Sequence, residues 1–255
     1  MAKIVAIVKM VPDLVEELEI NEAGTGLKRD WLRLIINELD NNAIEQAILL
    51  KERYSGEVTV IAADAEGVED MLFTTAAKGA DRMIKLAGDL EEGANNHALA
   101  RVFAKAVKPY QPDLILTGVQ ANDDLDGPVG PLVAEYLGMP YVGYISGVSI
   151  EGNKAVVRKE YPGGLIGEME VTLPAVLGIQ AGEEPPRYVA ISKIRQMMKT
   201  AEIDEQEISE LDSNGGLIAK RMYLPEAAER AEMIEGDEEE IAAKLVAIFK
   251  EAGAL

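Results

Sequence analysis

The sequence predicts a doubly wound α/β domain whose mostly parallel sheet continues into an antiparallel extension. Between residues 3 and 138, strand-like apolar runs alternate with amphipathic segments four times, which is typical of parallel strands joined by crossover helices. After Tyr144 this alternation stops, and strand-like runs follow one another around a turn at residues 151–153. The chain has 255 residues, which is enough to bury a sizeable core.

Each element is predicted from its own pattern. Short continuous apolar runs are typical of strands buried on both faces, and apolar residues that recur with a period near 3.6 are typical of helices. The predicted strands span residues 3–11, 57–63, 82–87 and 113–118. The predicted helices span residues 41–54, 68–80, 95–110 and 127–138. Residues 147–164 and 165–182 are predicted to form the antiparallel extension.

The C-terminal third has a different character. We expect an α/β domain with its antiparallel extension over residues 1–184, and a partner-recognition loop and C-terminal arm over residues 185–255. Beyond Pro185 the chain has loops, acidic runs and one amphipathic helix, but no second core. Because an apolar stripe on a helix needs a cover, we expect the arm to wrap a partner. This stripe consists of Ile241, Leu245, Ile248 and Phe249.

Composition excludes several classes of function. The chain has no cysteine and one histidine, His97, so thiolate catalysis is excluded and no metal site is predicted. Neither a nucleophile nor a metal ligand adjoins His97, and we assign it no reaction. The formal net charge of −20 disfavours binding to nucleic acid or anionic membranes. The N-terminal apolar run breaks at Lys9 and is too short to cross a bilayer, so we expect a cytoplasmic protein.

The segment GVQANDDLDGPVG, residues 118–130, is the strongest candidate for a ligand site. It follows a predicted strand and precedes a predicted helix, which is where open α/β sheets bind ligands. Gly127 permits close backbone approach, Pro128 suits a first helical turn, and amides near Val129 are suited to a phosphate. A solvated helix cap explains the same residues, and this alternative stays open. The glycine-rich dinucleotide fingerprint and the Walker A loop are both absent.

Several blocks, taken together, resemble the β subunit of electron transfer flavoprotein. They occur in order and with similar spacing: VAIVKMVPD, INELDNNAIEQAILLKE, KGADR, GVQANDDLDGPVG and LPAVLGIQAGEEPPRYVAISKI. The resemblance implies a Rossmann-like, adenine-nucleotide-binding fold, structural AMP in this chain, and a heterodimer with an α subunit that holds most of the FAD. It also implies an electron carrier without catalytic activity of its own. Electrons would pass from acyl-CoA or other dehydrogenases to a quinone reductase or another acceptor.

Carried over by position, the resemblance places the AMP site at the ends of three predicted strands. The implied cofactor-binding residues are Ile7, Asn37, Glu38, Leu39, Asp40, Ala63, Gly118, Val119, Gln120, Ala121, Asn122, Asp123, Asp124, Leu125, Asp126, Gly127, Pro128 and Val129. The carboxyl ends of parallel strands meet at one sheet edge, so the topology predicts the same place independently. Asn37 and Asp40 also fit plain helix caps.

The resemblance assigns three further residues outside the AMP site. Leu14 is implied to lie close to the flavin and to contribute to one wall of its site. Ile191 is implied to anchor a partner dehydrogenase, although ordinary packing against the domain explains it as well. Glu160 is implied to pair with basic groups of the FAD-bearing domain.

Three alternatives stay open. Some members of the family bind a second FAD in the β subunit and bifurcate electrons. They carry acidic and hydroxyl groups where this chain has Asn95, Asn96, Leu99 and Ala100, so AMP is favoured here. An ATP-binding stress-type or ATP-pyrophosphatase-like protein needs a phosphate loop that the segment after the first strand does not provide. The third alternative is an interaction scaffold with an empty site.

Overall fold

The structure is a computed structural model that describes residues 2–88, 90, 94–124, 127–208, 211–226 and 231–255. The chain divides into two compact units, Met1–Arg221 and Met222–Leu255. The first unit contains the sheet and the pocket described below. The second contains a single helix in its described residues.

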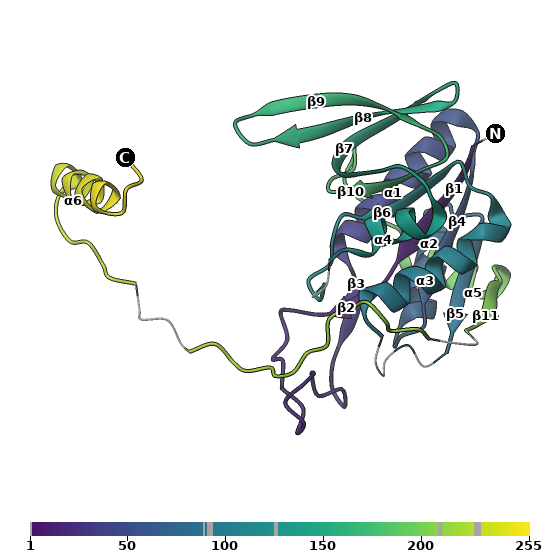
Figure 1. The fold of residues 1–255 in the computed structure, drawn as a ribbon, viewed down its shortest axis with the longest axis horizontal. Helices are drawn as coiled ribbons and strands as arrows, with labels where there is room; N and C mark the ends of the chain where they lie inside the picture. The colour runs from purple at the N-terminus through teal and green to yellow at the C-terminus, as the bar shows by residue number, and fades with distance from the viewer. Residues whose placement is uncertain (1, 89, 91–93, 125–126, 209–210, 227–230) are drawn as a thin grey trace. The chain divides into compact units, whose positions relative to one another are not determined.

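One large sheet organises the first unit. Its strands are β1 (Lys3–Val8), β4 (Glu57–Ala63), β5 (Arg82–Ala87), β6 (Leu114–Gly118), β7 (Tyr141–Glu151), β8 (Lys154–Tyr161), β9 (Leu165–Thr172), β10 (Ala175–Ile179) and β11 (Ile203–Glu207). Within the described residues these nine strands have the order β11-β5-β4-β1-β6-β10-β7-β8-β9 (Figure 1). Neighbours from β11 to β7 are parallel, and β7, β8 and β9 are antiparallel. The predicted fold class is therefore confirmed.

Helices cover both faces of the parallel strands. They are α1 (Glu38–Tyr54), α2 (Val68–Lys78), α3 (Asn96–Val107), the short 3-10 helix η1 (Lys108–Tyr110), α4 (Val129–Leu137) and α5 (Ile191–Thr200). Side chains of α1 and α2 pack with Ile4, Ala6 and Val8 in one buried cluster. Side chains of α3 and α4 pack with Val5 and Ile7 in a second cluster. Because alternate residues of a strand point to opposite faces, β1 contributes to both layers.

The first predicted strand is interrupted after Val8. Residues 10–12 form β2 (Met10–Pro12), which pairs antiparallel with β3 (Leu34–Ile36) in a separate ribbon. The amide of Lys9 donates to a carboxylate oxygen of Asp40 at 3.0 Å, so it does not continue the ladder of β1. A side chain distant in sequence thus ends the strand.

The strand β10 corrects our expectation for the antiparallel extension. The sequence run at residues 175–179 was predicted to be antiparallel, but β10 lies between β6 and β7 and is parallel to both. All five of its residues are buried, as is typical of a central parallel strand covered on both faces.

The compact unit continues beyond residue 184. Helix α5 contacts α2, and β11 adds a parallel edge strand beside β5. The ammonium group of Lys85 lies 2.6 Å from carboxylate oxygens of both Glu69 and Glu205, and so links β5 to α2 and to β11. Recognition of a partner by residues 185–255 stays a prediction.

The second unit contains the helix α6 (Glu238–Glu251). Its N-cap is Asp237, whose Oδ1 accepts a hydrogen bond from the amide of Glu240 at 2.9 Å, as expected for an aspartate cap. No residue of α6 is buried in the described chain, and Leu245, Ile248 and Phe249 are exposed. Within the second unit, the described residues therefore leave three of the four residues of the predicted apolar stripe exposed.

Candidate functional site

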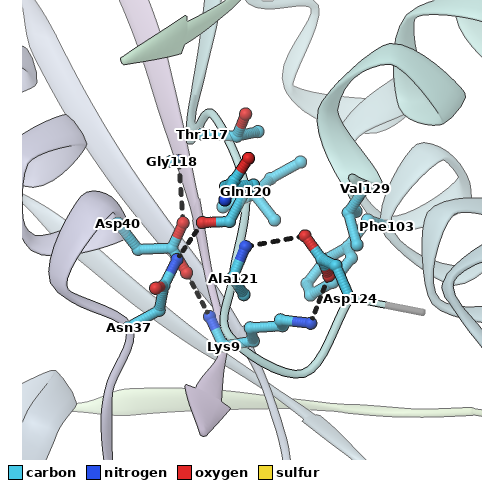
Figure 2. Close-up of a pocket in the computed structure, with 11 residues that line it drawn as sticks. Lys9, Asn37, Asp40, Phe103, Thr117, Gly118, Gln120, Ala121, Asp124 and Val129 are labelled. Atoms are coloured by element: carbon cyan, nitrogen blue, oxygen red, sulfur yellow. Dashed lines mark hydrogen bonds and ion pairs between the residues drawn. The ribbon is translucent and has the colours of Figure 1, made fainter. Parts of the chain in front are cut away.

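A pocket lies at the carboxyl ends of β1 and β6 (Figure 2). It is lined by Ile7, Lys9, Asn37, Asp40, Phe103, Thr117, Gly118, Gln120, Ala121, Asp124 and Val129. The chain leaves β1 toward α1 on one face of the sheet and leaves β6 toward α4 on the other. The pocket therefore lies at a topological switch point, where doubly wound sheets bind ligands.

The carboxylate of Asp40 joins three elements at the base of this pocket. Its Oδ2 accepts a hydrogen bond from the amide of Lys9 at 3.0 Å, and its Oδ1 accepts one from the amide of Gly118 at 2.7 Å. The side chain thus connects the first turn of α1 to the ends of β1 and β6. Burial raises the pKa of Asp40 to about 6, against the opposing effect of both amides and of the Lys9 charge.

Close packing at the end of β6 explains why Gly118 is a glycine. A Cβ atom at this position would lie 2.5 Å from Oδ1 of Asp40 and 2.7 Å from the carbonyl carbon of Leu39. Both distances are far below van der Waals contact, so the first turn of α1 packs directly on the strand backbone. Gly118 is therefore required by packing, whatever the pocket binds.

Asn37 occupies the N-cap position of α1 but makes no cap hydrogen bond with its side chain. Its Nδ2 instead donates to the backbone oxygen of Gln120 at 3.0 Å (Figure 2). The side chain therefore ties α1 to the loop after β6. The helix-cap interpretation of Asn37 does not describe what this side chain does.

A largely buried ion-pair network holds the loop after β6. Nζ of Lys9 lies 2.7 Å from Oδ1 of Asp123 and 2.8 Å from Oδ1 of Asp124. The side chains of Lys9 and Asp124 are only 11% and 8% exposed. Burial lowers the pKa of Lys9, but the two carboxylates outweigh this effect and raise it overall. The single ammonium group thus offsets one of the two negative charges that it pairs with.

Asn96 of α3 holds the far end of the same loop. Its Nδ2 donates to Oδ1 of Asp124 at 2.8 Å and to the backbone oxygen of Gly127 at 2.6 Å. Gly127 has φ of +98°, and a Cβ there would meet nothing within 4 Å. Glycine is therefore favoured at 127 by backbone conformation, not by close contact with protein atoms.

Two features beside α4 supply polar groups near the pocket. Pro128 is the N-cap of α4 and gives it no side-chain hydrogen bond, so the first-turn amides lack that usual acceptor. Oγ1 of Thr117 is buried without a hydrogen-bond partner among the described residues. A Cβ on Gly130 would lie 2.6 Å from this oxygen, which places the hydroxyl against the first turn of α4.

The structure places many of the predicted cofactor-binding residues on the pocket wall. Those on the wall are Ile7, Asn37, Asp40, Gly118, Gln120, Ala121, Asp124 and Val129. Those beside it, in the first turn of α1, at the end of β4 or in the loop after β6, are Glu38, Leu39, Ala63, Val119, Asn122, Asp123, Gly127 and Pro128. Leu125 and Asp126 lie outside the described residues. Nucleotide binding by these residues stays a prediction.

Sequence reasoning missed three residues on the wall: Lys9, Thr117 and Phe103. The sequence does mark Lys9 as unusual, because a lysine interrupts an otherwise apolar strand run. Phe103 on α3 carries none, since an apolar residue in a helix is usually part of the core. Thr117 is hidden in the same way inside the buried run of β6.

The other predicted functional residues lie outside the pocket. Leu14, in the turn after β2, and Ile191, the first residue of α5, are exposed. Glu160 is an exposed residue of β8. Nδ1 of His97 lies 3.0 Å from the hydroxyl of Tyr136, so this ring contacts a neighbouring helix.

Among the residues that the structure describes, no group of three or more His, Asp or Glu side chains is arranged to hold a metal ion. None of the helices described in the structure is long and apolar enough to cross a membrane.

The fold and the pocket define an α/β protein with a ligand site at the carboxyl edge of a parallel sheet. The family model described as "Electron transfer flavoprotein domain" matches residues 27–211. The electron transfer flavoprotein subunit beta of Methylophilus methylotrophus is 34% identical, covering 98% of each chain. The same subunit of Bacillus subtilis is 30% identical, over 92% of this chain and 93% of its own length. That of Clostridium acetobutylicum is 31% identical, over 97% of this chain and 98% of its own length. The chain therefore belongs to the β-subunit family of electron transfer flavoproteins.

Proposed function

We propose that this chain is the β subunit of a heterodimeric electron carrier and that its pocket holds AMP in a structural role. The α subunit holds most of the FAD, which supplies the redox chemistry when bound. This chain contributes the scaffold, one wall of the flavin site near Leu14, and a surface that docks electron donors. The observation that carries the proposal is the pocket at the β1/β6 switch point, in a chain with β-subunit relatives along nearly its full length.

The polar groups around the pocket support a mononucleotide. The side-chain amide of Gln120, the hydroxyl of Thr117 and the first-turn amides of α4 provide polar groups. Such helix amides are suited to one phosphate group.

The charges beside the pocket argue against a triphosphate. The carboxylates of Asp40, Asp123 and Asp124 lie near a single ammonium group, that of Lys9, so the local charge is negative. A triphosphate needs several cations or a glycine-rich loop of free amides. The network therefore supports AMP over the ATP-binding alternative.

The contacts of α3 bear on the electron-bifurcating alternative. Asn95 is the N-cap of α3 and accepts a hydrogen bond from the amide of Ala98 at 2.9 Å. Asn96 is engaged by the loop after β6. Since both amides already have partners, this segment offers few free polar groups for a second FAD. AMP is the better-supported cofactor of this chain.

In the proposed electron path, acyl-CoA or other dehydrogenases reduce the FAD of the heterodimer, and a quinone reductase or another acceptor oxidises it. The residues of this chain bind, orient and dock, and none of them is assigned a covalent or proton-transfer step. We therefore expect no catalytic activity from this chain alone. An exposed Ile191 at the start of α5 is suited to fill an apolar pocket on a dehydrogenase.

Identification of the bound nucleotide tests this function. The chain is co-expressed with the α subunit from the same organism, and nucleotides released by acid are identified by mass spectrometry. We expect one AMP and one FAD per heterodimer. Two FAD molecules per heterodimer indicate the bifurcating form, ATP indicates the stress-type alternative, and no adenine nucleotide in this chain contradicts the proposed pocket.

A further inference from the structure

A lysine lies between two tyrosine rings on the surface of the antiparallel extension. Nζ of Lys159 is 5.5 Å from the ring centroids of both Tyr144 and Tyr161, within the distance of a cation–π interaction. The two tyrosines are 47% and 44% exposed. The hydroxyl of Tyr144 also lies 3.4 Å from Oε1 of Gln120, so the cluster adjoins the rim of the pocket.

Specific backbone features hold both rings in place. Tyr144 has φ of +61°, an uncommon conformation for a large residue and one found preferentially at functional sites. The pairing of β7 with β8 is irregular just beyond it, between Ile145 and Gly147. The ring of Tyr161 lies on Gly167 of β9, where a Cβ would be 2.9 Å from Cε2 of the ring. A side chain at 167 would displace this ring.

Lys159 differs in its contacts from Lys154, Lys9 and Lys85. Lys154, on the same strand, pairs with the carboxylate of Glu170, and Lys9 and Lys85 each pair with two carboxylates. Among the described residues, Lys159 contacts tyrosine rings and forms no ion pair. A cation without a carboxylate, on a chain with a net charge of −20, is electrostatically complementary to an acidic group of another molecule.

The surroundings of Lys159 are apolar and exposed. Leu165 pairs directly with Tyr161 across the β8–β9 hairpin, so the two side chains share one face, and Leu165 is 67% exposed. When a partner covers such a surface, water is excluded and the attraction between Lys159 and a carboxylate becomes stronger. Nucleic acid and anionic lipid fit poorly because the chain as a whole repels polyanions.

We propose that Tyr144, Lys159, Tyr161 and Leu165 form a docking site for a carboxylate side chain of the α subunit. This inference rests on the heterodimer proposed above. The two tyrosine rings and Leu165 provide the apolar contact area, and Lys159 provides the charge that positions the α subunit on this surface. Glu160 points to the opposite face of the strand.

Carbodiimide cross-linking of the wild-type heterodimer tests this site directly, because the reagent joins a lysine amine to a carboxylate in contact with it. We expect mass spectrometry to find Lys159 joined to an Asp or Glu of the α subunit, and Lys154 not joined to that subunit. Two results contradict the proposed docking site. One is that no cross-link joins Lys159 to the α subunit, and the other is that such a cross-link appears only when a dehydrogenase is added. If the wild-type chains form no complex, the proposed function fails together with this inference.

A matched pair of variants provides a second test. Lys159→Met removes the charge and keeps most of the side-chain length, whereas Lys154→Met removes a charge from the same strand outside the cluster. We expect Lys159→Met to weaken association with the α subunit about ten-fold at low salt and to flatten its salt dependence. Lys154→Met and Lys159→Arg stay within about two-fold of wild type. Thermal unfolding of each variant checks the fold, and wild-type affinity and salt dependence in Lys159→Met contradict the site.

Discussion

At the scale of single residues, Asp40 shows how one side chain both builds the pocket and ends a strand. Its carboxylate accepts the amides of Lys9 and Gly118, and no other residue joins α1 to both strand ends in this way among the contacts described. The cost of this arrangement is a buried charge, which burial disfavours strongly unless hydrogen bonds compensate.

This buried carboxylate leads to a pH prediction. The pKa of Asp40 is raised to about 6 in the folded chain, whereas an unfolded aspartate titrates near about 3.9. Between these values the folded state binds more protons, so the free energy of unfolding falls as pH rises through this window. Asp40→Asn lacks the titrating group and serves as the reference. Relative to it, we expect the free energy of unfolding of the wild type to fall by about 1 kcal/mol between pH 5 and pH 7. Urea unfolding of both proteins at each pH measures these free energies. The prediction is contradicted if the free energy of unfolding of the wild type minus that of Asp40→Asn stays constant or rises with pH.

Gly127 gives a second prediction at this scale. Gly127→Val forces a β-branched residue into a left-handed conformation, which costs roughly 1–2 kcal/mol, and it adds bulk beside the backbone amides that we propose contact the nucleotide. We expect the AMP content of the purified heterodimer to fall while FAD stays bound. Gly138→Val is the matched control, because Gly138 has φ of +65°, has nothing within 4 Å of its Cβ position and follows α4, away from the pocket wall. A full complement of AMP in Gly127→Val means that this loop only caps a helix.

At the scale of elements, local patterns predicted helices and parallel strands, but pairings between distant segments were not predictable. The alternation of apolar and amphipathic runs identified β1, β4, β5 and β6 because their burial on both faces leaves a continuous apolar signal. The place of β10 between β6 and β7 carries no such signal, since its partners lie far away in the sequence. The strand β11 was missed because IDEQE is polar, as edge strands often are.

The same reasoning explains which parts of the pocket were foreseen. The end of β1, the start of α1 and the loop after β6 are visible in the sequence and through the family resemblance, and eight of the cofactor-binding residues predicted there lie on the wall. The pairing of Lys9 with Asp123 and Asp124 joins residues more than 110 positions apart, and only the parallel arrangement of β1 and β6 brings them together. Single-sequence patterns contain no information about such contacts.

The helix α5 offers a prediction that separates docking from packing. Ile191 is exposed, whereas Met197 on the same helix packs against the buried cluster of α1 and α2. Ile191→Ala is therefore expected to leave the melting temperature, the AMP content and the flavin spectrum near wild type but to slow electron transfer from the physiological dehydrogenase. Met197→Ala is the reverse control, with lower stability and little direct effect on docking. A loss of roughly 2–5 kcal/mol in Ile191→Ala identifies it as a core residue instead.

At the scale of the whole molecule, the two compact units differ in what stabilises them. The sheet of the first unit has buried clusters on both faces, and β11 adds backbone hydrogen bonds at its edge. The second unit has one helix in its described residues, with no buried residue in it. Isolated helices of this length are marginally stable in water unless another surface covers their apolar face.

Hydrogen exchange measures this difference directly. In the chain alone, we expect the amides of β11 (Ile203–Glu207) to be protected with the sheet, because they pair with β5, and the amides of α6 to exchange rapidly. When the α subunit is added, α6 becomes protected if the C-terminal arm wraps that subunit, because burial of Leu245, Ile248 and Phe249 stabilises the helix. The triple variant with alanine at these three positions is the control, and its α6 amides stay fast in the complex. Equal exchange of α6 with and without the α subunit contradicts the wrapping arm and leaves the stripe to another partner.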